Sequence, residues 1–288
     1  MGTLEGKVAF VTGAGSGIGR GIAERFAREG AHVCIADVDV EGAEYSANLV
    51  GQLGSRSLVT KTNVASKEQL ADAVERCVAE FGRLDISVAN AGIGRGGPVL
   101  EMALKDWQDQ LDINLTGVFL TVQLTARKMV EVGNGGRIIC TSSLAAENTA
   151  AGTWSYSATK AGVRMMVRGW GQELGPHGIT VNAIGPGVID TPLAAGLAGE
   201  EGGAIRKNLE ALTPVGRAGQ PADIAGLAAF MAGPDGSFMT GAYVLIDGGL
   251  RDVRWSGTQS EEIAEEAARH ADSAIARRAK LQPLFDDR

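Results

Sequence analysis

A tyrosine and a lysine stand four residues apart in the stretch YSATK, which runs from Tyr156 to Lys160. The segment has helical spacing and Ser155 is its expected cap, so the phenol and the ammonium share one helix face. Lowering the pKa of a phenol from about 10 to about 7 takes roughly 4 kcal/mol. One positive charge at about 4 Å, in an effective dielectric near 20, supplies roughly that amount. The pair could therefore take a proton from an alcohol, although the same spacing is common on exposed helices.

A second candidate is the glycine-rich run TGAGSGIG at residues 12–19, which follows the apolar run VAFV at residues 8–11. The apolar run is typical of a short buried strand, and the residues after the glycines have helical spacing. Glycines in such a strand-to-helix turn let backbone N–H groups approach phosphates, and Gly19 lets the helix pack closely on the strand. The spacing is Gly13-x-x-x-Gly17-x-Gly19, and a plain tight turn is the alternative interpretation.

An acidic residue about 20 positions further on supports the phosphate interpretation. Asp37 ends the second strand-like run, where a carboxylate can bind the hydroxyls of an adenine ribose. No arginine or lysine stands beside Asp37 in the sequence, and Ser16 occupies the turn position where a base could meet a 2′-phosphate. A carboxylate repels such a phosphate, so the pair predicts NAD rather than NADP.

These residues must be positioned by a sheet, and the chain alternates strand-like runs with helical segments. Residues 70–82 place one apolar stripe on a helix face, formed by Leu70, Ala73, Val74, Cys77, Val78 and Phe81. Continuous β-branched strands between helices predict a parallel sheet covered on both faces, and right-handed crossovers make it doubly wound. The strand-like runs are residues 8–11, 32–37, 57–64, 85–90, 137–143, 179–186 and 243–247.

Together these motifs resemble the short-chain dehydrogenase/reductase family over residues 5–251. Further matching pieces follow the glycine turn in the family order: Asn63 with Val64, NAG at residues 90–92, Asn114 in DINLTG, Ser143, YSATK, and GPGVIDT at residues 185–191. Ser143 lies thirteen residues before Tyr156, which is the family spacing. The resemblance implies an α/β fold: a single-domain, Rossmann-type, doubly wound parallel sheet of about seven strands with helices on both faces.

The resemblance also implies a catalytic tetrad of Asn114, Ser143, Tyr156 and Lys160. Tyr156 would act as the general acid/base, and Ser143 would hydrogen-bond the substrate oxygen as charge develops on it. Lys160 would lower the pKa of Tyr156 and hold the nicotinamide ribose. Asn114 would fix a water that links Lys160 to solvent. The implied reaction is the NAD-dependent interconversion of a secondary alcohol and a ketone by hydride transfer.

For the cofactor, the resemblance implies contacts from several loops at one edge of the sheet. Val64 and Asn90 would flank the adenosine, and Thr191 with the backbone of Ile189 would meet the carboxamide. The expected cofactor residues are Gly13, Ser16, Gly17, Ile18, Gly19, Asp37, Asn63, Val64, Asn90, Ala91, Gly92, Tyr156, Lys160, Pro186, Gly187, Ile189 and Thr191. Asn63 replaces a more usual aspartate, and its amide could still meet the adenine amino group. Ala146 replaces a frequent glycine and could narrow the pocket.

Composition limits the other functions. The formal net charge of −7 argues against a nucleic-acid partner. The apolar runs are shorter than the roughly 20 residues of a membrane span. Free thiols in a reducing compartment are predicted for Cys34, Cys77 and Cys140, and no signal peptide is evident, so we expect a cytoplasmic protein. The three histidines show no ligand spacing, so we expect no metal site.

Other classes fit the motifs less well. The sequence has no G-x-S-x-G elbow of a hydrolase and no P-loop. Longer epimerase and dehydratase relatives share a Tyr-x-x-x-Lys pair, but they use a different glycine spacing and usually add a larger substrate domain. A non-catalytic NAD-binding sensor on the same fold is the remaining alternative. An intact tetrad argues against it, since a sensor need not keep all four groups.

The substrate cleft should lie beyond the carboxyl ends of the strands. We expect it to be lined by residues 92–100, residues 144–154 and a mobile lid at residues 193–212. These segments are mostly small and apolar, and the expected substrate contacts are Ser143, Tyr156 and Trp154. A cyclic or modest-sized apolar secondary alcohol fits best, while steroid, terpene, aryl, sugar-derived and diol substrates stay open, as does the direction of reaction. Arg95 or Glu147 could bind a polar group.

Two further expectations concern assembly and the end of the chain. In the resembled family two long helices usually pair across a two-fold axis, here those around Asn114 and Tyr156, so we expect a homotetramer. The stripe expected at that contact is Val163, Met166, Val167 and Trp170. Residues 253–288 form a predicted C-terminal helical extension after an NAD-binding oxidoreductase domain at residues 1–252. Within it, residues 260–280 should form a helix that docks on a neighbouring subunit or across the substrate entrance, or else stay a solvated tail.

Overall fold

Seven parallel strands form the centre of the protein in the computed structural model, which describes residues 2–198 and 203–252. The strands are β1 (Val8–Thr12), β2 (His32–Asp37), β3 (Ser57–Lys61), β4 (Ile86–Ala89), β5 (Gly136–Thr141), β6 (Ile179–Pro186) and β7 (Tyr243–Ile246). Their order in the sheet is β3-β2-β1-β4-β5-β6-β7, and each neighbouring pair is parallel. The predicted doubly wound sheet of about seven strands is confirmed.

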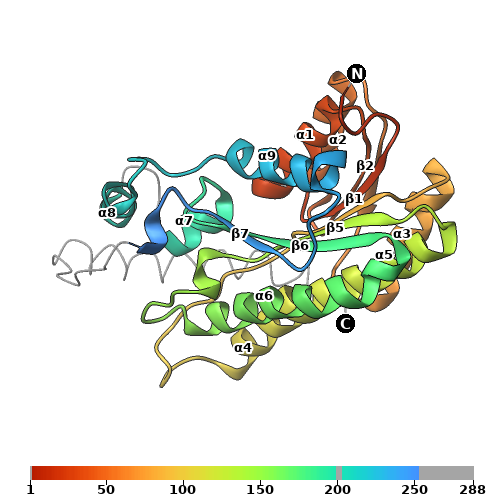
Figure 1. Ribbon diagram of the computed structural model, residues 1–288. Coiled ribbons are helices and arrows are strands. Elements are labelled where there is room, and N and C mark those ends of the chain that lie inside the picture. The colour runs from red at the N-terminus through yellow and green to blue at the C-terminus, as the bar shows by residue number, and fades with distance from the viewer. Residues whose placement is uncertain (1, 199–202, 253–288) are drawn as a thin grey trace.

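Helices cover both faces of the sheet (Figure 1). One face carries α1 (Gly17–Arg28), α2 (Val40–Gln52) and α9 (Pro221–Ala232). The other carries α3 (Lys67–Phe81), α5 (Gly117–Val132) and α6 (Trp154–Leu174), with α4 (Leu104–Leu111) beside α6. After β6 come α7 (Pro192–Ala198) and α8 (Ala204–Leu212). Short helical turns are η1 (Asp112–Thr116), η2 (Leu144–Ala146), η3 (Gly175–His177), η4 (Pro234–Gly236) and η5 (Leu250–Asp252).

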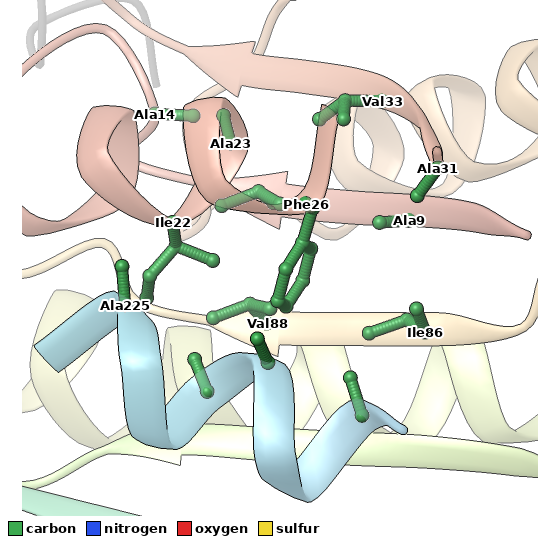
Figure 2. Close-up of a cluster of buried hydrophobic side chains, with 14 of the residues drawn as sticks. Ala9, Ala14, Ile22, Ala23, Phe26, Ala31, Val33, Ile86, Val88 and Ala225 are labelled. Atoms are coloured by element: carbon green, nitrogen blue, oxygen red, sulfur yellow. The ribbon is translucent and has the colours of Figure 1, made fainter. Parts of the chain in front are cut away.

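The core follows from the alternation of side chains along each strand. In β1, Ala9 and Val11 join one buried cluster, while Val8 and Phe10 join the cluster on the opposite face. Figure 2 shows the first cluster, in which Phe26 of α1 is directed across the layer toward the strand that carries Val88 and toward α9. Full burial of one such phenylalanine stabilises the fold by roughly 1.5–3 kcal/mol.

The predicted helix at residues 70–82 is confirmed as α3, which begins slightly earlier. Ser66 caps it, because the Gln69 backbone N–H donates to the Ser66 hydroxyl at 3.3 Å. The stripe faces the sheet, and its most buried members are Leu70, Ala73, Val74 and Cys77. Gly82 ends the helix in the left-handed conformation, at a φ of 76° that other residues adopt at a cost.

Some predicted boundaries are wrong, for reasons that involve side chains. The third strand stops at Lys61 rather than residue 64, since the Asn63 Oδ1 accepts from the Ala65 N–H at 3.0 Å and turns the chain. Ser155 is not a helix cap: α6 begins at Trp154 with Thr153 before it. The Ser155 hydroxyl instead accepts from Gln110 Nε2 at 2.7 Å, which joins α6 to α4.

The segment predicted as a lid forms α7 and α8 in the part that the structure describes. Arg206 of α8 is buried, with its guanidinium 3.6 Å from Asp190 and 2.8 Å from Glu210. The predicted extension at residues 253–288, with its helix at residues 260–280, lies outside the described residues. Within residues 2–198 and 203–252, none of the helices has the length and apolar character that crossing a bilayer requires.

Candidate active site

The site lies where the chain changes direction across the sheet, between β1 and β4. Ligands of doubly wound sheets bind at such a switch point, beyond the carboxyl ends of the strands. Asn90 follows β4, and its Nδ2 donates to the carbonyls of Thr12 at 3.0 Å and Gly13 at 3.2 Å. Its Oδ1 accepts from the Thr141 hydroxyl at 3.1 Å. Asn90 therefore ties the ends of β1, β4 and β5 together beside the glycine turn.

The glycine turn has a shape that side chains would prevent. Gly13 and Gly17 have φ angles of 64° and 52°. A Cβ atom added to Gly13 would lie 2.8 Å from the Cα of Ala91, and one added to Gly19 would overlap the carbonyl oxygen of Gly13. A Cβ on Gly17 would lie 3.1 Å from the Thr191 side chain, so two predicted cofactor segments meet at this turn.

The N-terminus of α1 is open toward this turn. Ser16 precedes the helix without a side-chain capping bond, and the first turn contains no acidic residue. By contrast, Asp39 caps α2 and Ser66 caps α3. Uncapped backbone N–H groups and the positive end of the helix dipole favour an anion. The turn therefore fits the pyrophosphate of a dinucleotide.

Asp37 lies beside the turn, as expected for a ribose-binding carboxylate. Its Oδ2 accepts from the Gly15 N–H at 2.7 Å and its Oδ1 from the Asp39 N–H at 3.0 Å. Burial raises the pKa of Asp37, and the hydrogen bonds from Asp39 and Gly15 act in the opposite direction.

Sequence reasoning missed a basic residue at the same place. Arg20 stands on the first turn of α1 and donates through Nη2 to the carbonyl oxygen of Gly15. Its Nε donates to the Ser46 hydroxyl at 3.0 Å, and its guanidinium lies 4.6 Å from the centre of the Tyr45 ring. The helical position of Arg20, three residues after Gly17, is the signal that could have revealed it.

Tyr156 and Lys160 lie on one buried face of α6. The side chains are 8% and 3% exposed, and the Lys160 Nζ lies 5.6 Å from the centre of the Tyr156 ring. The Nζ donates to the carbonyl oxygen of Thr141 at 2.9 Å. Since Thr141 ends β5, the lysine is fixed against the carboxyl edge of the sheet.

Burial controls the protonation of this pair. It raises the pKa of Tyr156 to about 12, against the lowering effect of a hydrogen bond with Ser143. It lowers the pKa of Lys160 to about 8. In the protein alone the phenol therefore keeps its proton at neutral pH, whereas we expected a pKa near 7. The difference arises because desolvation disfavours the phenolate more than its polar neighbours favour it.

Ser143 is held at the start of η2. Its hydroxyl oxygen accepts from the Ala145 N–H at 3.1 Å, and its backbone is extended, with φ of −169° and ψ of 157°. The hydroxyl proton stays available for Tyr156 or for a substrate oxygen. The structure therefore brings Ser143, Tyr156 and Lys160 together at the end of β5, as the sequence predicts.

Asn114 is fully buried within η1, a π-helical turn between α4 and α5. Its side-chain amide bonds both backbone groups of Ile93, with Oδ1 accepting and Nδ2 donating at 2.8 Å each. A Cβ on Gly92 would lie 3.2 Å from the Asn114 Oδ1 and 3.5 Å from the Lys160 Nζ. Asn114 and Lys160 thus both approach Gly92 on the side to which its Cβ would point. A π-helical turn such as η1 often occurs at a functional site.

The remaining predicted cofactor residues shape the site mainly through the backbone. The Asn63 Oδ1 is engaged with Ala65, and Val64 packs so closely on Gly117 that a Cβ there would lie 2.7 Å from it. Gly187 follows Pro186 at the end of β6, and its N–H donates to the Ile246 carbonyl at 2.9 Å. Ile189 is buried and pairs with Gly219.

Trp154 and the two polar candidates have partners inside the protein. Trp154 stacks on Trp107 with 5.8 Å between ring centres, and its Nε1 donates to the Gly97 carbonyl at 3.3 Å. Arg95 lies 3.7 Å from Asp106. Glu147 pairs with Arg164 at 3.1 Å and with Arg251 at 3.2 Å. Arg95 and Glu147 are therefore ion-paired in this structure.

Known proteins resemble this chain in sequence and in fold. A family model described as enoyl-(acyl carrier protein) reductase matches residues 13–251. Cis-4-hydroxycyclohexanecarboxylate dehydrogenase from Sinomonas cyclohexanicum is 40% identical over 248 residues, which cover 86% of this chain and 97% of that protein. A short-chain type dehydrogenase/reductase structure from Mycobacterium marinum is 36% identical, with a TM-score of 0.81 and coverage of 86% and 96% of the two chains. Carveol dehydrogenase from Mycobacterium avium in complex with NAD is 32% identical, with a TM-score of 0.81 and coverage of 87% and 99%.

The chain therefore belongs to the short-chain dehydrogenase/reductase family. The resemblance predicted from the motifs is confirmed, and so is the fold that it implied. Since its relatives are dehydrogenases and reductases, the protein is an oxidoreductase of this family.

Proposed function

We propose that the protein interconverts a secondary alcohol and a ketone with NAD, using Tyr156 as the general acid/base. The observation that carries the proposal is the buried convergence of Ser143, Tyr156 and Lys160 beside a glycine turn whose helix end is uncapped. A sensor needs the turn alone, whereas burying an ammonium and a phenol without a chemical task is costly.

In the oxidative direction Ser143 and Tyr156 hold the substrate oxygen by hydrogen bonds. The alcohol O–H proton passes to the phenolate oxygen of Tyr156 while the C–H bond of the carbinol carbon breaks and the C=O bond forms. An oxidised nicotinamide held at this site would supply the hydride acceptor and a positive charge that favours the phenolate form of Tyr156. In the reductive direction the protonated Tyr156 donates the same proton to the carbonyl oxygen.

Lys160 and Asn114 support this proton transfer without exchanging the substrate proton themselves. In our proposal the Lys160 ammonium favours the phenolate form of Tyr156 by charge and holds the nicotinamide ribose. Its pKa of about 8 lets it exchange a proton near neutral pH, which suits a relay to solvent. Asn114 fixes the loop after β4 through both of its bonds to Ile93, so it keeps Gly92 against Lys160.

The preference for NAD is supported by the position of Asp37. Its carboxylate accepts from Gly15 within the phosphate-binding turn, where a 2′-phosphate would meet a like charge. The positive charge of Arg20 would favour a 2′-phosphate and so oppose the effect of Asp37. Its guanidinium, however, already bonds Gly15 and Ser46 and lies over the Tyr45 ring. We therefore propose that NAD is favoured and NADP is used weakly.

The proposed substrate is a cyclic or modest-sized, largely apolar alcohol. Small residues dominate the segments beyond β4 and β5. The stacked Trp107 and Trp154 add aromatic surface beside the segment after β4, since the Trp154 Nε1 donates to the Gly97 carbonyl. The name of the 40% identical relative from Sinomonas identifies a hydroxylated cyclohexane carboxylate as its substrate. Ser143, Tyr156 and Trp154 are the proposed substrate contacts.

A panel of alcohols with NAD, read by the absorbance of NADH, tests the proposal. The panel contains cyclohexanols with and without a carboxylate, terpene alcohols, hydroxysteroids, aryl carbinols, diols and sugars. We expect turnover with cyclic alcohols. NAD binding by calorimetry with no turnover of any alcohol or matching ketone would instead favour the non-catalytic sensor.

We also propose a cytoplasmic homotetramer. The buried free thiols of Cys34, Cys77 and Cys140 support a reducing compartment. The stripe expected at the subunit contact packs on its own sheet instead, and its members are Val163, Met166, Val167 and Trp170. Other apolar side chains are exposed on the two helices: Phe119, Val130 and Val132 of α5, and Met165 of α6. These support pairing of α5 and α6, and a monomeric mass by light scattering at micromolar concentration would contradict it.

A further inference from the structure

The carbonyl oxygen of Ser143, in the loop after β5, accepts a hydrogen bond from a side chain on β7. The Tyr243 hydroxyl donates to it at 2.7 Å, across a separation of 100 residues in the chain. Tyr243 is the first residue of β7 and pairs with Ala183 of β6. The bond therefore fixes the loop that carries Ser143 to the sheet.

Apart from the hydrogen bond with Tyr156, the other bonds of Ser143 stay within its own loop. The hydroxyl oxygen accepts from the Ala145 N–H at 3.1 Å, and the carbonyl accepts from the Ala146 N–H at 2.9 Å. Those two bonds shape the turn, but they do not fix the turn relative to the rest of the protein. The preceding residue, Ser142, is bonded to the Ile184 carbonyl of β6 and to the Lys160 carbonyl of α6, each at 2.8 Å. The bond from Tyr243 adds the point at which the Ser143 carbonyl itself is held, one residue nearer to the hydroxyl.

The surroundings of Tyr243 hold its hydroxyl in place. Gly185 of β6 provides the space that the Tyr243 hydroxyl occupies, since a Cβ at this position would lie 2.5 Å from the Tyr243 Oη. The Arg164 guanidinium lies 4.9 Å from the ring centre, and Glu147 pairs with Arg164 and Arg251. Burial raises the pKa of Tyr243, so its hydroxyl stays a donor at any pH used for assay.

We propose that Tyr243 is a positioning residue for the reaction, which sets the direction of the Ser143 hydroxyl toward Tyr156 and the substrate oxygen by holding the Ser143 carbonyl. This inference rests on the proposed alcohol dehydrogenase function. A hydrogen-bond donor is effective only when it is held within about 0.5 Å of its productive position, roughly 2.7–3.1 Å from the oxygen on which charge develops. Without the Tyr243 bond the loop would still be held at Ser142, but the Ser143 carbonyl would be free to turn, so the hydroxyl would lose precision without any loss of fold.

Tyr243→Phe removes one oxygen atom and keeps the ring that Arg164 covers. We expect kcat to fall roughly three- to tenfold, while KM for NAD changes less than twofold. The matched control is Tyr45→Phe, which removes the hydroxyl of an exposed ring away from the serine loop and should leave kcat unchanged. An unchanged kcat in Tyr243→Phe overturns the proposal.

The pH profile separates positioning from loss of folded protein. Because Ser143 lowers the pKa of Tyr156, a misplaced serine should move the rise of the oxidation rate to higher pH in Tyr243→Phe. A smaller folded fraction would lower the rate equally at all pH values and would overturn the proposal. If Tyr243→Phe does not fold, Gly185→Ala keeps the hydroxyl but displaces it, and the same shift is expected.

A double-mutant cycle with Ser143→Ala tests the route of the effect. If Tyr243 acts through Ser143, then Tyr243→Phe should change kcat by less than about twofold in the Ser143→Ala background. Equal losses in both backgrounds would show that Tyr243 acts elsewhere and would reject the inference alone. Failure of the proposed function has a different result, because Ser143→Ala by itself would then leave activity intact.

Discussion

The two halves of the site are built in opposite ways. On the cofactor side the decisive feature is the absence of side chains, since a Cβ on Gly13, Gly17 or Gly19 would meet a neighbour at close range. On the catalytic side the decisive feature is side chains that are costly to bury, with Tyr156 8% exposed and Lys160 3% exposed. The first half is defined by shape and the second by electrostatics.

The layers behind the two halves differ in the same way. The cluster around α1 and α9 is made of apolar side chains, and the members labelled in Figure 2 are alanine, valine, isoleucine and phenylalanine. The layer behind Tyr156 contains buried polar groups among its apolar ones, namely Gln110, Asn114, Thr121, Thr125, Thr159 and Lys160. We infer that changes near α1 act through packing, while changes near α6 also act through protonation.

The largest expected effect comes from removing the proton acceptor on the electrostatic side. Tyr156→Phe keeps the ring but loses the oxygen that exchanges the proton, so kcat should fall roughly 10²–10⁴-fold. Calorimetry should show that NAD still binds with affinity within a few-fold of the wild type. Activity close to that of the wild type would disprove the role of Tyr156.

The next largest effect tests the side defined by shape. Gly19→Ala places a Cβ against the Gly13 carbonyl, so the turn must open and NAD affinity should fall roughly 10–100-fold. The matched control is Gly51→Ala in α2, where an added Cβ meets nothing within 4 Å. That control should bind NAD normally and gain up to about 1 kcal/mol of stability. Equal affinity in both variants would contradict the packing argument.

A smaller effect is expected at the ribose end of the turn. Asp37→Ala removes the carboxylate that would repel a 2′-phosphate, so the ratio of kcat/KM for NAD to that for NADP should fall roughly tenfold. Arg20→Gln should shift the ratio the other way by removing a guanidinium next to Gly15. A wild-type preference for NADP, or no response to Asp37→Ala, would count against this assignment.

The smallest effect concerns stability and its pH dependence. Burial lowers the pKa of Lys160 from 10.5 to about 8, so between these values the unfolded chain binds a proton that the folded protein lacks. The contribution of Lys160 to stability therefore improves as the pH rises through this window, and below pH 8 the full cost of burial is present.

Lys160→Met should accordingly be roughly 1–2 kcal/mol more stable than the wild type at pH 7, although it loses activity. The gain should shrink between pH 8 and 10.5. Urea unfolding at pH 7 and at the upper end of the window measures both values, with the exposed Lys67→Met as the control. A variant less stable than the wild type at pH 7 would show that the bond to Thr141 outweighs the desolvation of the ammonium.

Local patterns in the sequence predict the features that depend on local geometry. The glycine spacing, the stripe of α3, and the four-residue separation of Tyr156 and Lys160 each follow from strand or helix periodicity. The fold follows because alternation of such elements permits few topologies.

The contacts that the sequence did not reveal join residues far apart in the chain. Gln110 meets Ser155, and Tyr243 meets the Ser143 carbonyl, through pairings set by the packing of whole elements. Periodicity says which face a residue occupies, not which partner it finds there. The ion pairs of Glu147 with Arg164 and Arg251 were missed for the same reason.

The π-helical turn between α4 and α5 has a consequence for tolerance to deletion. Leu111, Asp112, Thr116 and Gly117 all have helical backbone angles, so α4, η1 and α5 form one continuous helix with a single widened turn. Each residue of an α-helix turns the chain by about 100°. Loss of one codon within residues 112–116 would close the widened turn and rotate all of α4 by that angle relative to α5. The reading frame would be kept, but Gln110 would turn away from Ser155. The loop after β4, which Asn114 holds through Ile93, would shift relative to Lys160.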